Sequence, residues 1–201
     1  MNPMEHALNK HSGVIKYIAR HGETKRNGGS DVVYRGWKEE PANQLDDKGI
    51  EDAEELGEEV KDMIKNPRDF VIVTSDLNRA RDTGKIVSDI SEIKLGKKYY
   101  DLRSMDTGFY TGKSVKEYQP EIDKHIEDHP DKPLKGSCES YNEFIARVKK
   151  AFEEEIPEDY PGKKILVITH HQVEVLQGNH FEPIGDEHYK KGIKPGHIRK
   201  I

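Results

Sequence analysis

Three segments of the sequence place a cationic or imidazole side chain just after an apolar run. VIKYIA is followed by Arg20 and His21, FVIVT by Ser75 and then Arg79, and KILVIT by His170. The planar guanidinium group of arginine matches the oxygens of a phosphate group, and a neutral histidine beside it can attack phosphorus. The sequence has neither a Walker-type loop nor a carboxylate cluster for magnesium. These residue types therefore indicate phosphoryl chemistry carried out by histidine and arginine.

This chemistry needs a scaffold that brings three strand ends together. The runs 14–19, 70–74 and 164–169 are short and apolar, as expected of strands buried inside a parallel sheet. Apolar residues at helical spacing predict helices from residue 50 to 64, after Ser75 as a helix cap, and over 141–152. Strands that alternate with helices predict an α/β fold with three α/β/α layers and a mostly parallel central sheet. Ligands bind beyond the carboxyl ends of such strands, so one shared pocket is expected there.

Length and composition limit the other possibilities. The 201 residues suit one α/β domain, which we place at 13–201 after a polar leader at 1–12, with a small insert around 105–136 and an edge strand in the tail. The net charge of −5, with both signs interspersed, disfavours nucleic acid as a partner. No apolar run is long enough to span a membrane. The single Cys138 cannot form an internal disulfide, and we expect a cytoplasmic location.

Five segments in order carry a family resemblance. They are RHGET at 20–24 with Asn27 following, LDDKGIEDAEELG at 45–57, TSDLNRARDT at 74–83, CESYNEFIARV at 138–148 and VITHHQV at 167–173. Together they resemble the histidine phosphatase superfamily, which has the phosphoglycerate mutase-like fold. The resemblance covers about residues 14–180, and it implies that fold for this chain.

The resemblance also implies roles for individual residues. His21 would be the nucleophile that forms a phosphohistidine intermediate, while Arg20, Arg79 and His170 would surround the transferring phosphoryl group. Gly22 would permit a tight turn that leaves the His21 ring exposed in the pocket. The phosphate or its loop would be supported by Thr24 and Asn27. Such a site requires no metal and no cofactor.

The sequence departs from the family pattern at two positions. Where much of the family has a glutamate as proton donor, this chain has Ser104, and we predict that Asp106 is the general acid instead. A carboxylic acid in this role would make the rate fall as the pH rises through its pKa. His171 stands where the family usually has glycine, so it is a candidate for substrate contact. Arg35, in the long loop at 25–43, is a second candidate for contact with a substrate anion.

These features predict a metal-independent phosphatase that hydrolyses phosphomonoesters and takes a small phosphorylated substrate. Two alternatives share the same site. One is a phosphoglycerate mutase-type phosphotransferase, and the other is a non-catalytic module that binds phosphorylated ligands. Substrate selectivity is expected to reside in the loops at 25–43 and 105–136.

Overall fold

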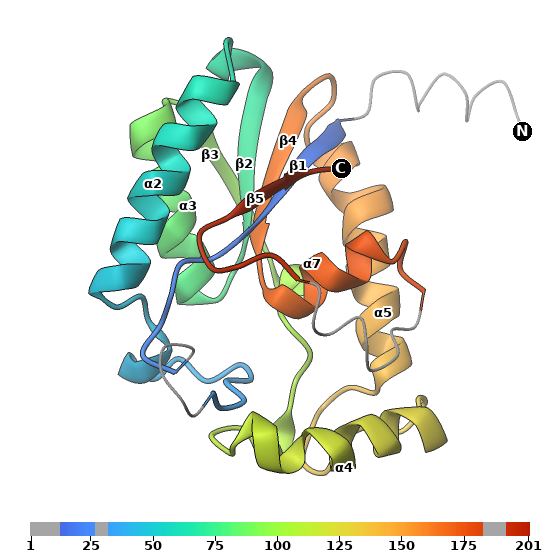
Figure 1. Cartoon of the computed structure of the whole chain (residues 1–201). Coiled ribbons are helices and arrows are strands. Elements are labelled where there is room, and N and C mark those ends of the chain that lie inside the picture. Colours follow the sequence, from blue (N-terminus) through green and yellow to red (C-terminus); the bar gives the residue numbers. More distant parts are fainter. Residues whose placement is uncertain (1–12, 27–31, 183–191) are drawn as a thin grey trace, which may run out of the picture.

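The computed structural model describes residues 13–26, 32–182 and 192–201, and its arrangement is shown in Figure 1. The expected polar leader at 1–12 and Asn27 lie outside these residues. The strands are β1 (Val14–Arg20), β2 (Phe70–Ser75), β3 (Lys94–Tyr99), β4 (Lys164–Thr169) and β5 (Ile198–Lys200). They form one sheet in the order β3-β2-β4-β1-β5. The pairs β1–β4, β2–β4 and β2–β3 are parallel, while β5 pairs antiparallel with β1. The mostly parallel sheet and the edge strand in the tail are therefore confirmed.

The other edge strand, β3, is not among the strands that the sequence predicted. It occupies Lys94–Tyr99, and a 3-10 helix, η3 (Tyr100–Leu102), follows it. The strand reads KLGKKY and most of its residues are exposed or half-buried. An edge strand that faces water on much of its surface needs no continuous apolar run, so it lacks the signal that identified the buried strands.

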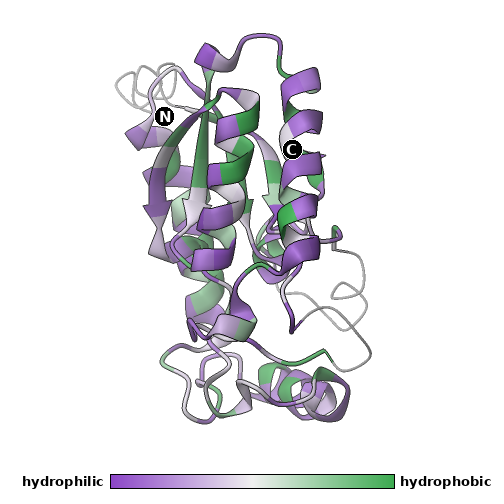
Figure 2. Cartoon of the chain, turned by 90° about the vertical axis from the view of Figure 1, so that its left-hand side faces the viewer, coloured by the Kyte–Doolittle hydropathy of each residue, from purple (hydrophilic) through white to green (hydrophobic). Residues whose placement is uncertain are grey.

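Alternating residues of the central strands face two separate cores. Ile18, Val71 and Val167 belong to one cluster of buried side chains, whereas their chain neighbours Ala19 and Ile72 belong to the other. Helices α5 (Tyr141–Lys150) and α7 (His171–Gly178) cover the first face, and α2 (Asp47–Met63) and α3 (Asn78–Ser91) cover the second. Figure 2 shows hydrophobic residues along the strands between these helices. The predicted three-layer α/β/α architecture is confirmed.

The apolar spacing correctly predicted the first helix, whereas the predicted cap of the second helix was wrong. Asp46 caps α2, because its carboxylate accepts a hydrogen bond from the Gly49 N–H at 2.9 Å. The predicted stripe is buried through its middle, but Ile50 at one end is 42% exposed. The prediction that Ser75 caps the next helix is wrong. α3 begins at Asn78, and Ser75 is instead the last residue of β2.

The remaining helices complete the layers. A capping box begins α5, since Ser140 and Glu143 each accept a hydrogen bond from the other's backbone N–H. α5 continues into a π-helical turn, η5 (Ala151–Glu155), and a short α6 (Ile156–Asp159). Short 3-10 helices are η1 (Pro41–Asn43) and η2 (Pro67–Asp69). In the described ranges, no helix combines the length and apolar character needed to cross a membrane.

The predicted insert lies beyond the carboxyl ends of the strands. It contains a 3-10 helix, η4 (Gly108–Tyr110), and α4 (Val115–Asp128), which Figure 1 shows apart from the sheet. The segment around Tyr34 pairs with it, because the Tyr34 N–H donates to the Lys113 carbonyl at 3.0 Å and the Gly112 N–H donates to the Tyr34 carbonyl at 2.7 Å. The two segments expected to govern selectivity therefore lie side by side.

Candidate active site

The sheet topology brings the three strand ends together. β4 lies between β1 and β2, so His170, which follows β4, is placed between His21, which follows β1, and Ser75, which ends β2. The His21 N–H donates to the Thr169 carbonyl at 3.0 Å. The ring centroids of His21 and His170 are 5.2 Å apart, and the two rings meet edge to face. The expected convergence is thus present in the structure.

Gly22 fixes the position of the loop after β1. A Cβ atom on Gly22 would lie 2.2 Å from the carbonyl oxygen of Gly49, which is far inside van der Waals contact. The Gly22 N–H also donates to Thr83 Oγ1 on α3 at 3.1 Å. Close backbone approach to the first turn of α2 therefore requires glycine here, and the loop is held against both α2 and α3.

His21 is fully buried, so the expectation that its ring is exposed in the pocket is wrong. Its Nδ1 lies 2.7 Å from the Gly22 carbonyl oxygen. A carbonyl oxygen can only accept, so Nδ1 carries the proton and Nε2 holds a lone pair. Nε2 has no hydrogen-bond partner among the described residues. Burial, followed by the nearby charges of Arg35 and Arg79, holds the pKa of His21 well below its usual value, so the ring stays neutral near pH 7.

His170 is the second buried imidazole of the site. Its Nε2 lies 2.9 Å from Ser75 Oγ, while its Nδ1 has no hydrogen-bond partner among the described residues. Burial and the charge of Arg79 lower its pKa well below the usual value. Burying a ring nitrogen without a hydrogen-bond partner costs free energy, and a bound ligand can supply the missing hydrogen bond. Nδ1 of His170 therefore marks a position where a ligand atom can bind.

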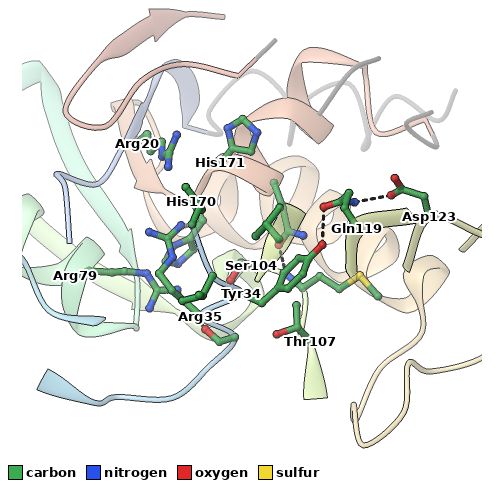
Figure 3. A pocket seen from close by; sticks show the side chains of 16 residues that line it. Arg20, Tyr34, Arg35, Arg79, Ser104, Thr107, Gln119, Asp123, His170 and His171 are labelled. Atoms are coloured by element: carbon green, nitrogen blue, oxygen red, sulfur yellow. Dashed lines mark hydrogen bonds between the residues drawn. The ribbon is translucent and has the colours of Figure 1, made fainter. Parts of the chain in front are cut away.

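Three guanidinium groups surround the histidine pair, and Figure 3 shows them at one end of a pocket. Arg79 is 1% exposed, and among the described residues only its Nη2 has a hydrogen-bond partner, the Gly36 carbonyl at 3.3 Å. Arg20 donates to the Ile193 carbonyl at 3.2 Å, and Arg35 donates to Thr24 Oγ1 at 3.4 Å. Burial lowers the pKa of Arg79 to about 10 and that of Arg35 well below its usual value.

Such an arrangement is costly for the protein alone and favourable for an anion. Like charges within one buried region raise the free energy of the folded state, and a bound dianion reverses the sign of that interaction. The guanidinium groups also present donors in the planar geometry that phosphate oxygens accept. The electrostatics of this end of the pocket therefore favour a phosphate group.

The pocket itself has a volume of about 570 Å³. It extends from the arginines and His170 past His171 to the segment around Tyr34 and to α4. The sequence-predicted candidates Arg35 and His171 both line it. Thr24 is fully buried beneath Arg35 as its hydrogen-bond acceptor, so it supports the loop and does not line the pocket.

Asp106 is not brought into this pocket. Its Oδ1 accepts a hydrogen bond from the Gly108 N–H at 3.1 Å, and its Oδ2 accepts one from the Cys138 N–H at 2.9 Å. Ser104, two residues earlier, lines the pocket instead. The expectation that Asp106 faces the phosphoryl group is therefore not met, because its carboxylate joins the start of η4 to the segment that precedes α5.

The segment that carries Ser104 is held by a buried ion pair. Arg147 on α5 binds Glu139 through two hydrogen bonds of 2.6 and 2.8 Å. The same guanidinium group donates to the carbonyls of Asp101, Arg103 and Ser104 at 2.9 to 3.0 Å. All the N–H groups of Arg147 are thus engaged, and the wall of the pocket is anchored to α5.

Sequence reasoning missed four residues at the site. Ser75 was interpreted as a cap, although a hydroxyl at the end of a wholly buried strand could have indicated a site residue. Tyr34, Gln119 and Asp123 line the far end of the pocket. They lie in polar segments that carry no motif, so nothing in the sequence singled them out.

The described residues contain no group of three or more histidine, cysteine, aspartate or glutamate side chains placed to hold a metal ion. At the strand ends, the side chains that converge on the pocket are cationic or neutral. Their chemistry suits an anionic ligand rather than a cationic one.

Several solved structures share the fold. The chain matches the alpha-ribazole phosphatase from Shigella flexneri with a TM-score of 0.67 and 21% identity, covering 90% of this chain and 87% of that one. It also matches the structure of mycobacterial glucosyl-3-phosphoglycerate phosphatase in complex with VO3. The TM-score is 0.66 and the identity 20%, and the match covers 90% of this chain and 88% of that one. A variant of phosphoserine phosphatase from Entamoeba histolytica, bound to phosphoserine, matches with a TM-score of 0.68 and 19% identity, covering 90% and 87%.

No curated protein sequence matches the chain significantly. The sequence model of one family, the histidine phosphatase superfamily (branch 1), matches residues 16–191, which is most of the chain. Both histidines and both arginines of the strand ends fall within this match. The chain therefore belongs to the histidine phosphatase superfamily, branch 1.

Proposed function

We propose that this protein is a phosphatase that hydrolyses phosphomonoesters without a metal ion, through a phosphohistidine intermediate on His21. The observation that carries the proposal is the state of His21, whose Nδ1–H is bound to the Gly22 carbonyl while Nε2 keeps its lone pair. A neutral imidazole fixed in this tautomer is a nucleophile. The family, and the phosphatase activity named for several structures of the same fold, support the proposal.

Binding begins with the phosphate group among the three arginines. His21 is covered in the structure, so a phosphoryl group reaches Nε2 only if the covering side chain moves. Arg35 has the largest charge effect of any residue on His21, and the hydrogen bond that it donates to Thr24 is long at 3.4 Å. We propose that Arg35 shifts from Thr24 to the phosphate, where its charge is compensated.

Transfer then proceeds in two steps. In the first, Nε2 of His21 attacks phosphorus, the bond from phosphorus to the ester oxygen breaks, and that oxygen leaves with the electron pair. In the second, water attacks phosphorus, the P–N bond returns its electron pair to Nε2, and the proton of the water goes to solvent or to phosphate. Arginines already in place stabilise the charge on the equatorial oxygens in both steps.

His170 is proposed to donate a hydrogen bond to one of those oxygens. The Leu77 N–H approaches Ser75 Oγ at 3.4 Å, which leaves the hydroxyl proton available for His170 Nε2 at 2.9 Å. His170 would then carry its own proton on Nδ1, which has no partner among the described residues. The orientation of Ser75 thereby selects the tautomer of His170 that can bind an anion.

No described carboxylic acid lines the arginine end of the pocket, where the leaving oxygen must be protonated. The general-acid role of Asp106 stays a prediction, because its carboxylate would have to release two backbone N–H groups to reach the pocket. Ser104 lines the pocket but is not a carboxylic acid. We therefore propose that the favoured substrates have leaving groups that depart readily without a strong acid, such as phenols.

The test is phosphate release from p-nitrophenyl phosphate in excess EDTA. We compare the parent with His21→Ala and with a control, His129→Ala, which removes an exposed imidazole at the end of α4. The parent and the control should release phosphate and His21→Ala should not, and a phosphorus NMR signal of Nε2-phosphohistidine should appear only in proteins that keep His21. Absence of release from the parent would contradict the proposal and favour the mutase or the binding module.

A further inference from the structure

The pocket is far larger than a phosphate group requires. Its volume of about 570 Å³ lies within the range of small-molecule sites, roughly 300–1,000 Å³. The arginines and histidines line one end, where the phosphate group of a substrate binds in the proposed function. The remaining volume is available to the rest of the substrate, so the side chains that line it determine which groups fit.

A stretch of extended chain leads from the arginine end of the pocket to α4. Val33 and Val32 shortly precede Arg35 in the sequence, and all three residues line the pocket. Val33 forms an antiparallel bridge with Ser114, and the N–H of Val115, at the start of α4, donates to the Val32 carbonyl at 2.8 Å. At about 3.3 Å per residue, this stretch extends the wall of the pocket roughly 10 Å beyond Arg35.

Apolar side chains line the pocket along this stretch. They are Val32 and Val33, Val115 from α4, and Met105. Val32 is 42% exposed, and Val33 and Val115 are half-buried, so their methyl groups are available to a ligand. Covering these methyl groups with hydrocarbon is favourable roughly in proportion to the apolar area removed from water. A ligand hydroxyl in the same place loses its hydrogen bonds to water and gains none from the valines.

Several polar side chains of the same wall already bond to the protein itself. The Tyr34 hydroxyl donates to Gln119 Oε1 at 2.6 Å, and Gln119 Nε2 donates to Asp123 Oδ1 at 2.5 Å, as Figure 3 shows. The hydroxyl groups of Thr107 and Thr111 lie 3.0 Å apart and form a further hydrogen bond. A ligand hydroxyl that binds to these groups has to compete with their existing hydrogen bonds.

The phosphate end has the opposite character. There, Nδ1 of His170 and two nitrogens of Arg79 have no hydrogen-bond partner among the described residues. Buried groups of this kind gain free energy when a ligand supplies the missing partner. The pocket therefore offers new hydrogen bonds to a phosphate group and mainly apolar contact to the group attached to it.

We propose that the preferred substrate is the phosphomonoester of an apolar alcohol or phenol, whose hydrocarbon part lies against Val32 and Val115. The proposal deepens the proposed function, on which it relies for the phosphate end alone. Phosphates of polyhydroxylated compounds should bind more weakly, because their hydroxyl groups leave water for a wall that does not replace the lost hydrogen bonds.

The test uses three phosphonates, which resist hydrolysis: 3-methylpentylphosphonate, 3,4-dihydroxybutylphosphonate and methylphosphonate. The first two have the same shape and differ only in two methyl groups that are replaced by hydroxyl groups, while the third provides the phosphonate alone. Calorimetry on the parent protein should show that the methylpentyl compound binds about tenfold or more tightly than either of the others. Equal affinities, tighter binding of the diol or no binding of any compound would overturn the proposal.

Two matched variants locate the effect. A double variant, Val32→Thr with Val115→Thr, replaces a methyl group by a hydroxyl group at each of two positions in the pocket. The control is Val14→Thr, which makes the same exchange at an exposed valine that begins β1 and does not line the pocket. The ratio of methylpentyl to diol affinity should fall in the double variant and keep its parent value in Val14→Thr. An equal fall in both proteins, or in neither, would refute the role of the two valines.

The two proposals fail in distinguishable ways. If the phosphonates bind in the predicted order but p-nitrophenyl phosphate is not hydrolysed by the parent, the ligand class stands and the phosphatase proposal falls. If p-nitrophenyl phosphate is hydrolysed but the phosphonates show no preference, the reverse holds.

Discussion

Two buried arginines should respond oppositely to the same substitution. Arg79 is 1% exposed, yet two of its three nitrogens have no hydrogen-bond partner among the described residues. Arg147, with a side chain 12% exposed, has every N–H group engaged by Glu139 and by three backbone carbonyls. Replacement by methionine keeps most of the buried volume and removes the charge. Arg79→Met is expected to stabilise the protein, and Arg147→Met to destabilise it.

The magnitudes follow from the contacts. Each buried donor without a partner costs about 1–3 kcal/mol, so removing Nε and Nη1 of Arg79 is favourable. The substitution also removes the 3.3 Å hydrogen bond to the Gly36 carbonyl, and this loss offsets about 1 kcal/mol of the gain in the free energy of unfolding. The free energy of unfolding should therefore rise by about 1–5 kcal/mol. Arg147→Met leaves the Glu139 carboxylate buried without its cation, which should lower the free energy of unfolding by about 3–5 kcal/mol.

The assay is urea denaturation followed by circular dichroism and by the fluorescence of Trp37, the only tryptophan of the chain. Phosphate at a hundred times its dissociation constant should stabilise the parent by about 2.7 kcal/mol. Arg79→Met should lose most of that effect, together with phosphatase activity. A stability loss above about 2 kcal/mol in Arg79→Met, with the phosphate effect retained, would refute the interpretation of Arg79 as an anion-binding group.

Three further predictions concern protons. Because burial holds the pKa of His21 and of His170 below that of the unfolded chain, the unfolded state binds protons first as the pH falls. The free energy of unfolding should therefore fall by roughly 2–3 kcal/mol between its value above about pH 6.5 and its value at pH 5.5. Urea titrations that give the same free energy of unfolding across this pH range would contradict the prediction. Ser104→Glu should place a carboxylic acid in the pocket and raise kcat/KM for alkyl phosphates relative to p-nitrophenyl phosphate by about 100-fold. Asp106→Asn should lower stability by about 1–2 kcal/mol while the ratio of alkyl to aryl turnover stays unchanged; a collapse of that ratio would establish Asp106 as the acid.

The buried strands and the residues that end them could be predicted from the sequence. β2 is buried throughout, β4 is buried after Lys164, and β1 is buried at Ile18 and Ala19 near its carboxyl end. Apolar runs of this kind are visible without any knowledge of partners. Parallel pairing then places their carboxyl ends at one edge, which is enough to bring His21 and His170 together. The need for a small residue at Gly22 was also visible, although its reason is the backbone of Gly49.

The direction of individual side chains was decided by the tertiary structure. Ser75, the predicted cap, contacts His170, and Asp106 turns toward the backbone N–H groups of Gly108 and Cys138. Arg35 lies close enough for its charge to lower the pKa of His21, although the two residues are fourteen positions apart. A side chain satisfies whichever partners folding brings within reach, and those partners lie on other elements.

The two ends of the pocket show the same division. The cationic end can be recognised from short sequence motifs, because each strand end contributes its own arginine or histidine. The far end includes Gln119 and Asp123, ordinary residues of a polar helix. It acquires its position only when α4 and the segment around Tyr34 pack beyond the sheet. Local sequence determined which chemistry is available to this protein, whereas contacts between distant segments decided where each charge faces, because only folding sets the distances between them.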